Sequence, residues 1–252
     1  MVLFPIAEND RTAAEPASAW AAVQEQQSRD SSYYWIITQP AHAALAGDLA
    51  AALREDLFGK LDATVARSIA LHDAGWSLDD AEQIQNLRAG KEKKPASFLE
   101  AGVDRFLAAW TASIDTAEKF APIGGYLVSR HFERLSQRDD AKDQAKLEAF
   151  RKREKQRQQR LKTKLDRDEE ALEKLVDALQ FCDLLSLYLC CGSKTNVVFS
   201  NPKVRLERDG EAYRISPNPF KGAHQFTFSA LKHPLTGAKK RESGANFYIN
   251  FG

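Results

Sequence analysis

The spacing of apolar residues along the chain predicts a mainly helical protein. Apolar positions recur every three or four residues across 41–58, 61–73 and 97–120, and the run 181–191 is almost entirely apolar. This period is typical of helices that bury one face or are buried all round. We therefore expect helices over 17–27, 41–58, 61–73, 77–87, 97–120, 126–135 and 181–191.

The interval 139–179 is highly charged and has an interrupted apolar seam, which predicts a helical hairpin that projects from the body. Its tract 151–164 holds eight Lys or Arg residues against one Glu. Such a tract could bind phosphate or nucleic acid, but charge runs are usually solvated helix faces. Because no aromatic residues are interleaved for stacking on bases, we favour the solvated face.

The pattern changes after Gly192. Residues 197–199, 204–207, 212–215, 225–228 and 246–251 alternate as strands do, and Asp209-Gly210 is a hairpin signal. Residues 33–37 resemble a short strand or an extended segment that leads into the next helix. We predict a mainly α fold, consisting of a helical bundle with the projecting hairpin and a small C-terminal antiparallel β layer. The expected organisation is an N-terminal segment (1–32), a helical domain (33–195) and a β appendage packed on it (196–252).

Composition and charge narrow the class of partner. The chain has 252 residues, 43% of them hydrophobic, and 36 Lys and Arg against 35 Asp and Glu. A net charge of +1 gives no reason to expect nucleic acid or an anionic membrane as a partner. The three cysteines lie in one apolar run, so free thiols in a reducing cytoplasm are expected. No segment resembles a signal peptide or a membrane span. The expected partner is a small molecule, and a homodimer is left open.

Polar residues interrupt four of the predicted apolar helices. These residues are His42, the pair His72-Asp73, His131 and Asp183. Each costs several kcal/mol (roughly 2–7) to bury without a partner. Taken singly, each is more often a satisfied core histidine or a surface aspartate. Together they favour convergence on a divalent metal, as in helical bundles that build metal sites from facing side chains.

This order of residues resembles the HD-domain superfamily of metal-dependent phosphohydrolases. More closely, the chain resembles a bacterial family known as domain of unknown function 3891, over about residues 33–220. The segments that carry this resemblance are Ile37 to Ala43 (Ile-Thr-Gln-Pro-Ala-His-Ala) with Leu45-Ala46-Gly47, His72 to Trp76 (His-Asp-Ala-Gly-Trp), Leu127 to His131 (Leu-Val-Ser-Arg-His), Phe181 to Leu187 (Phe-Cys-Asp-Leu-Leu-Ser-Leu) and Pro217 to Phe220 (Pro-Asn-Pro-Phe).

The HD resemblance implies a fold, a ligand set and a chemistry. The fold would be an HD-like helical bundle. His42, His72, Asp73 and Asp183 would bind one metal, and Asp73 could bridge to a second metal bound by His131. The ions would be Fe, Mn, Zn, Mg or Ni, one or two in number. A metal-activated water would attack phosphorus.

Arginines next to His131 are candidates for binding the phosphate. Arg130 and Arg134 lie one turn apart, and Arg130 joins Asp73 as a candidate catalytic residue. The alternative interpretation of both is an ordinary surface arginine.

The chain departs from the HD pattern at two places. Only His131 lies between Asp73 and Asp183, where dinuclear HD enzymes usually have two histidines. Trp76 stands where many HD hydrolases carry a lysine near the substrate. Both departures argue against a standard nucleotide or cyclic-dinucleotide hydrolase. Trp76, with Tyr126, could instead line a more apolar substrate pocket.

Three functions are compatible with these residues. The first is a metal-dependent hydrolase of a small phosphorylated compound. The second is a di-iron oxygenase of the HD fold, and the third is a non-catalytic metal-binding or signalling module. No Walker loop, dinucleotide-binding glycine pattern, nucleophile elbow or paired Cys-x-x-Cys is present, so those enzyme classes gain no support.

Overall fold

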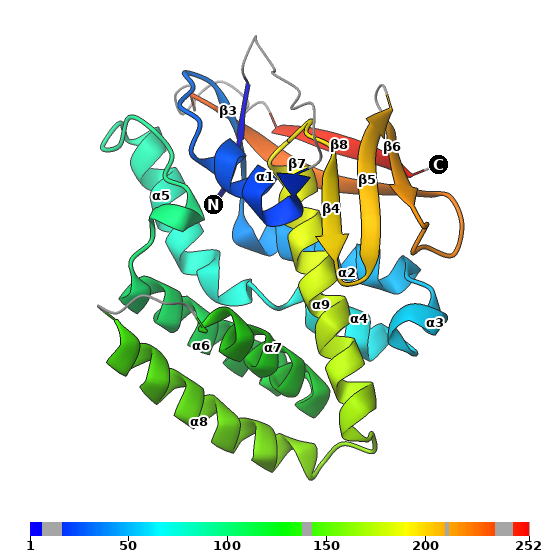
Figure 1. Cartoon of the computed structure of the whole chain (residues 1–252). Helices are drawn as coiled ribbons and strands as arrows, with labels where there is room; N and C mark the ends of the chain where they lie inside the picture. Colours follow the sequence, from blue (N-terminus) through cyan, green and yellow to red (C-terminus); the bar gives the residue numbers. More distant parts are fainter. Residues whose placement is uncertain (7–16, 138–142, 210–211, 235–243, 252) are drawn as a thin grey trace.

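The computed structural model describes residues 1–6, 17–137, 143–209, 212–234 and 244–251. A curled sheet covers one side of the molecule, and the helices lie beneath it and beside it (Figure 1). The helices are α1 Ala19–Gln27, α2 Gln39–Ala52, α3 Glu55–Phe58, α4 Ala63–Ala70, α5 Ser77–Arg88, α6 Val103–Phe120, α7 Pro122–Leu135, α8 Gln144–Lys162 and α9 Glu169–Cys190, with short 3-10 turns η1 Ala74–Trp76 and η2 Phe98–Glu100. The strands are β1 Val2–Pro5, β2 Ala17–Ser18, β3 Tyr34–Ile37, β4 Val197–Ser200, β5 Lys203–Asp209, β6 Ala212–Ser216, β7 His224–His233 and β8 Gly244–Phe251.

The eight described strands form one mixed sheet in the order β1-β3-β7-β8-β6-β5-β4-β2. The pairs β2–β4 and β6–β8 are parallel, and the other neighbours are antiparallel. Ile36 of β3 lies opposite Leu231 of β7. The sheet therefore joins strands from the first 37 residues to strands near the C-terminus.

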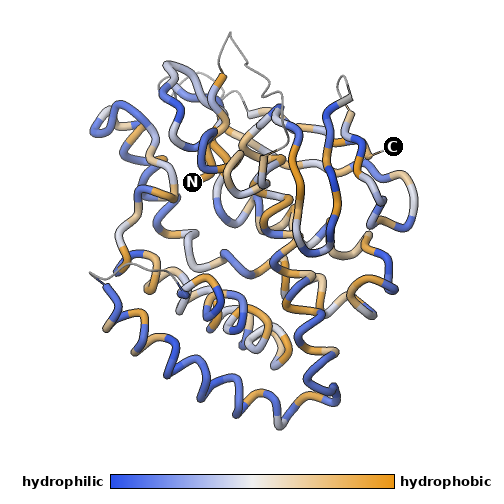
Figure 2. Tube along the Cα trace, viewed as in Figure 1, coloured by the Kyte–Doolittle hydropathy of each residue, from blue (hydrophilic) through white to orange (hydrophobic). Residues whose placement is uncertain are grey.

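The sheet and the helices share a main apolar core to which α9 contributes many buried residues, and a smaller separate cluster joins β1 and β3 to α5. Helix α9 runs from the lower helices up to the sheet, and its second half is strongly apolar (Figures 1 and 2). Phe181 stacks on Phe58 with ring centroids 6.0 Å apart and meets Phe199 of β4 edge-on at 5.3 Å. Among the described helices, none is both long and apolar enough to cross a membrane.

The predicted mainly α fold with a small C-terminal antiparallel layer is wrong. The sheet is a major part of the molecule, is mixed, and includes β1, β2 and β3 from the N-terminal region. The strands β1, β2 and β3 are only two to four residues long, and their partners lie far away in the sequence. A local pattern cannot reveal such pairing, because the pairing depends on where the chain returns. Residues 7–16 of the predicted N-terminal segment lie outside the described residues.

The predicted projecting hairpin is also wrong. Helix α8 packs along α7, and Leu147, Phe150 and Leu161 are buried against the body. Glu154 of α8 is buried as well and accepts a hydrogen bond from the hydroxyl of Ser129 on α7 at 3.0 Å. The interrupted seam, within its described part 143–179, thus faces the protein core. Residues 138–142 and the hairpin position Gly210 lie outside the described residues.

Helix α7 begins earlier than its sequence predicts. Pro122 and the pair Gly124-Gly125 predict a helix break, and the chain does break at Ala121 between α6 and α7, but both glycines lie inside α7. A Cβ added to Gly124 would lie 2.6 Å from the backbone oxygen of Ala117 on α6. The glycines therefore serve close helix packing, which brings the His131 end of α7 into the core.

Candidate metal centre

His42 is positioned by the start of α2. The Thr38 hydroxyl accepts a hydrogen bond from the backbone N–H of Ala41 at 3.3 Å, and Pro40 fits in the first turn. The helix consequently begins at Gln39 and carries His42 into the core, where it is completely buried.

His72 and Asp73 lie in the turn that follows α4. The helix ends at Ala70, and the backbone N–H of His72 donates to the carbonyl of Ile69 at 3.1 Å. Consecutive residues within a helix diverge by about 100°, but this turn directs both side chains to one side. Gly75 then packs directly on α6, with its N–H donating to the Ser113 hydroxyl at 2.9 Å. The turn is therefore held against a rigid helix.

The remaining candidate ligands come from two helices that pack together. His131 lies near the end of α7, and Asp183 lies in the second half of α9. Both point toward the His72-Asp73 turn. Residues separated by up to 141 positions in the chain thus meet at one point.

The five candidate ligands form a compact buried cluster. The Nε2 atom of His42 lies 2.9 Å from Oδ2 of Asp73, and Nε2 of His72 lies 3.2 Å from Oδ1 of Asp183. His72 Nε2 is 3.7 Å from Asp73 Oδ2, and His131 Nε2 is 3.5 Å from Asp183 Oδ2. The three imidazoles are at most 1% exposed, whereas the two carboxylate side chains are 11% and 14% exposed. The open side of the cluster is therefore its carboxylate side.

The neighbours of His42 and His72 assign their ring protons. Nδ1 of His72 lies 2.8 Å from the carbonyl of Ile69, so this nitrogen carries the proton and donates it. Nδ1 of His42 lies 3.0 Å from the hydroxyl of Ser186, which itself donates to the carbonyl of Asp183. That nitrogen must therefore be the donor to Ser186. In their neutral forms, both rings present an Nε2 lone pair to a carboxylate.

An imidazole Nε2 lone pair and a carboxylate oxygen repel each other at contact distance unless a proton or a metal ion lies between them. Burial alone would lower the pKa of His72, but the carboxylates of Asp73 and Asp183 raise it to about 9. Burial likewise acts to raise the pKa of Asp183, while the hydrogen bond and charge of His72, with the other two imidazoles, lower it to about 2. The cluster therefore attracts a cation strongly.

The unpaired ring nitrogens of His131 independently indicate that a further group binds at the cluster. Both of its ring nitrogens are buried and have no hydrogen-bond partner among the described residues. Burial lowers the pKa of His131 to about 4, which keeps the ring neutral and available as a ligand. Buried polar atoms are nearly always paired, so an unpaired imidazole beside a carboxylate indicates a group that would bind there.

The donor set and its spacing fit a divalent metal ion. His42, His72 and Asp73 form one set of ligand atoms within 4.8 Å of one another, and His72, His131 and Asp183 form another. Two donors bonded to one cation at about 2.1 Å lie roughly 3 to 3.5 Å apart. The distances above fall close to this range. Imidazole with carboxylate suits Zn, Fe, Mn or Ni, and His72 belongs to both sets.

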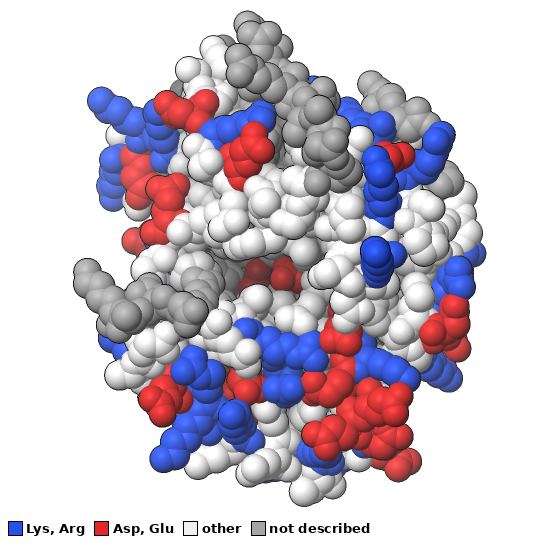
Figure 3. Space-filling model, in the orientation of Figure 1, with Lys and Arg blue, Asp and Glu red and all other residues white. Residues whose placement is uncertain are grey.

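A cavity of about 700 Å³ opens onto the cluster. Asp73, His131 and Asp183 face it, and most of its remaining lining is aromatic or aliphatic. On the surface, acidic atoms lie on the floor of a hollow near the middle of one face (Figure 3). The cavity has a size typical of small-molecule sites.

The candidate substrate residues lie at different distances from this cavity. Trp76 and Arg134 line it, but Arg130 and Tyr126 do not belong to its lining. Arg130 donates to both oxygens of Glu173, at 2.9 and 2.8 Å, and also pairs with Glu133. Arg134 donates to Glu173 at 2.6 Å and to Asp177 at 2.6 Å. Both guanidinium groups are thus held by carboxylates.

Several residues of the site were not identified from the sequence. Gln39 and Gln180 line the cavity, and Ser186 orients His42. Each lies three residues from a candidate ligand, either His42 or Asp183, and so occupies the same helix face. The three-residue spacing from a candidate ligand could have indicated these residues, but polar residues at such positions are common on helices.

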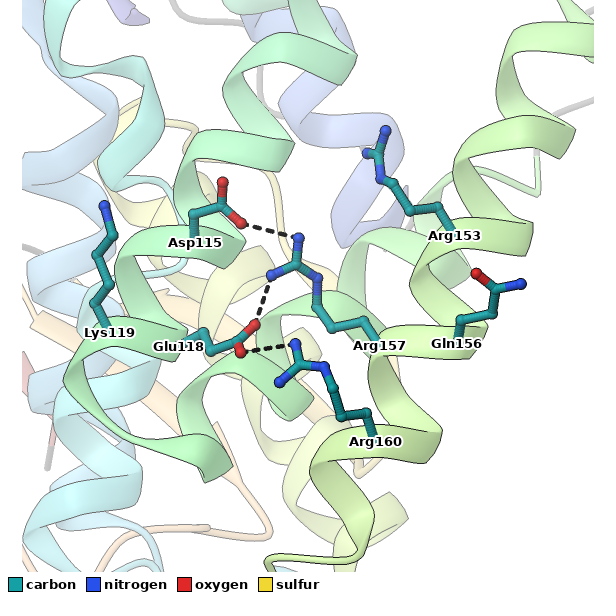
Figure 4. A pocket seen from close by; sticks show the side chains of 7 residues that line it. All are labelled: Asp115, Glu118, Lys119, Arg153, Gln156, Arg157 and Arg160. Carbon is teal, nitrogen blue, oxygen red and sulfur yellow. Dashed lines mark hydrogen bonds and ion pairs between the residues drawn. The ribbon is translucent and has the colours of Figure 1, made fainter.

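The basic tract 151–164 lies away from the cavity and pairs with α6. Arg157 donates to Glu118 at 2.6 Å and pairs with Asp115 at 2.9 Å, and Arg160 donates to Glu118 at 2.7 Å (Figure 4). These contacts join α8 to α6 across an open surface pocket. They favour the interpretation of the tract as a helix face over a site for phosphate or nucleic acid, with Arg157 and Arg160 paired to carboxylates of α6.

Comparison with known proteins identifies one family. A family model described as "Protein of unknown function (DUF3891)" matches residues 26–233. This interval runs from the end of α1 to the end of β7 and contains all five candidate ligands. No curated protein and no solved structure matches the chain.

Proposed function

Because the chain belongs to the DUF3891 family, whose description names no activity, we propose its function from the site: a metal-dependent hydrolase of a small phosphorylated compound. One observation carries this proposal. His42 and His72 have their Nδ1 protons committed to Ser186 and Ile69, and their Nε2 atoms face the carboxylates of Asp73 and Asp183.

Each residue of the cluster has a distinct task in this proposal. His42, His72, Asp73, His131 and Asp183 hold the metal, while Ser186 and the Ile69 carbonyl fix the orientation of the rings. A bound divalent cation would supply a water of lowered pKa and neutralise charge on phosphoryl oxygens. Asp73 and Asp183 are the partly exposed members, so the substrate's polar group meets the cluster on their side.

In this proposal one arginine contacts the substrate and the other positions that arginine. Arg134 lines the cavity and is the cation that can face a phosphoryl group. Arg130 contacts the same carboxylate oxygen of Glu173 as Arg134 does, at 2.8 and 2.6 Å. Arg130 therefore positions Arg134 through Glu173, although its sequence position next to His131 had suggested a direct role.

We also propose that the family is a divergent branch of the HD-domain superfamily. The support is the order His42, His72-Asp73, Asp183 and the origin of these residues on helices and a helix-ending turn. The extensive mixed sheet is additional to the helical unit that the resemblance implies.

The lining of the cavity favours one alternative, a di-iron oxygenase. The cluster offers three imidazoles and two carboxylates, and the space in front of it is mostly apolar. Iron at two equivalents per chain, with oxygen consumption and no phosphatase activity, would support the oxygenase in place of the hydrolase.

Metal analysis of purified variants tests the proposed centre. We expect wild type to carry one or two divalent ions per chain, and His72→Ala and Asp73→Ala to lose most of them. His224→Ala, a histidine of the sheet, is the matched control and should keep the wild-type content. Equal metal content in wild type and both site variants would remove the proposal. A screen of phosphate esters with each metal then tests hydrolysis.

A further inference from the structure

The walls of the cavity are aromatic, whereas its floor carries the carboxylates of Asp73 and Asp183. Trp76, Phe106, Trp110 and Phe132 form a continuous path of aromatic rings, with successive centroids 5.4, 5.4 and 5.0 Å apart. All four residues line the cavity and are at most 6% exposed. Their mutual packing fixes the ring positions, so the wall is already formed before any ligand enters.

The rim of the cavity continues this apolar character. Trp20 of α1 and Leu135 at the end of α7 line the cavity and are 40% and 38% exposed. Leu184, one residue after Asp183, also lines it. An apolar path therefore extends from solvent to the carboxylates at the floor.

Positive charge is scarce in the same space. Among the described residues that line the cavity, Arg134 is the one Lys or Arg. Its guanidinium already donates to Glu173 and Asp177, each at 2.6 Å, and to Gln180. A ligand with several phosphates would bring negative charges that this lining cannot pair, and burying an unpaired charge is costly.

We infer that the substrate is a phosphate monoester, or a similar compound with a single oxygen-rich head, on an apolar body. The head meets the Asp73, His131 and Asp183 side of the cluster, and the body lies against the Trp76–Phe132 aromatic wall. This inference rests on the proposed function, because the head is the group on which the metal site would act. The same lining predicts that nucleoside triphosphates and other polyphosphates are not substrates.

Isothermal titration calorimetry gives a direct binding measurement that does not depend on turnover. The probe is 2-naphthylmethylphosphonate, a non-hydrolysable compound with one phosphonate head and an aromatic body. Metal-loaded protein would be titrated with this probe, with inorganic phosphate and with ATP.

We expect the naphthyl phosphonate to bind at least about tenfold more tightly than phosphate or ATP, since it buries an aromatic ring system. Leu135→Gln should weaken it by about tenfold. Leu78→Gln changes an apolar residue that is 86% exposed and lies outside the cavity lining, and should leave affinity unchanged. Leu135 is itself exposed, so its replacement leaves the core intact.

Two other outcomes separate the inference from the proposed function. ATP or phosphate binding as tightly as the naphthyl phosphonate, with all three dependent on metal, overturns the inference and leaves the metal-dependent function standing. The naphthyl phosphonate could instead bind equally well with and without metal, and 2-naphthylmethanol could bind as tightly as the phosphonate. Both results together would show that the head does not contact a metal. That result would remove the proposed function while supporting an apolar ligand.

Discussion

At the scale of single residues, the centre depends on which nitrogen of each imidazole carries a proton. His42 and His72 each donate from Nδ1 to a fixed acceptor, namely Ser186 and the Ile69 carbonyl. This leaves Nε2 as the atom that faces Asp73 or Asp183. A proton and a metal ion therefore compete for the same lone pair, and binding of one displaces the other.

This competition predicts that metal affinity rises with pH. Without metal, the carboxylates raise the pKa of His72 to about 9, so the ring is protonated at pH 7 and must lose that proton to bind a cation. We expect affinity to increase by about tenfold per pH unit between pH 6 and 8, with release of about one proton per ion. Calorimetry in buffers of different ionisation enthalpy measures both quantities. A flat affinity over this range would show that His72 is not a ligand.

The candidate ligands were identifiable from the sequence because charged and imidazole groups stand out in apolar helices. Asp183 lies in the run Phe181 to Cys191, where a carboxylate needs a partner. The residues that support the ligands were not identifiable in this way. Ser186 and Gln39 are ordinary helix residues until the fold shows that they face His42 and the cavity.

At the scale of elements, the position of the His72-Asp73 turn depends on how closely it packs on α6. A Cβ added to Gly75 would lie 2.1 Å from the backbone oxygen of Ala109 and 2.6 Å from the backbone nitrogen of Ser113. Both are backbone atoms of a helix and cannot move aside by a rotamer change. Any side chain at this position must push the turn away from α6.

Gly75→Ala is therefore expected to destabilise the protein by about 1–3 kcal/mol or more, as overpacking does, and to weaken metal binding by displacing His72 and Asp73. Denaturant unfolding and metal titration measure the two effects. Gly244→Ala is the matched control, because a Cβ there would make only an ordinary van der Waals contact, 3.7 Å from the backbone oxygen of Ala230. Similar stabilities for the two variants would contradict the assigned packing.

Helices were predicted well at this scale, and their ends less well. The apolar period located α2, α4, α6 and the second half of α9, whose first half had been assigned to the hairpin over 139–179. The predicted break near Pro122 does occur, at Ala121, but Gly124 and Gly125 lie inside α7 and serve its contact with α6. A glycine pair has the same sequence appearance in both roles. Only the partner helix distinguishes a break from a close approach.

At the scale of the whole molecule, the sheet and the helical layer are joined through α9. Its Phe181 contacts Phe199 of the sheet, and two residues later Asp183 reaches the cluster formed with α2, α4 and α7. The sheet was the least predictable part of the fold. Local alternation revealed the strands after Gly192, but the pairing of β3 with β7 joins residues 195 to 199 positions apart.

Because the five candidate ligands come from α2, the turn after α4, α7 and α9, a bound ion would link four segments of the chain. A ligand that binds only the folded state stabilises it by about 2.7 kcal/mol at a hundredfold excess over its Kd. For a chain of this size, such a contribution corresponds to roughly 5–10 °C in Tm. We therefore expect chelation to lower the Tm of wild type by that amount, and re-addition of the metal to restore it. His72→Ala should start near the chelated value and should not respond to chelator. If wild type and His72→Ala respond alike, the ion that stabilises the fold is bound somewhere other than this cluster.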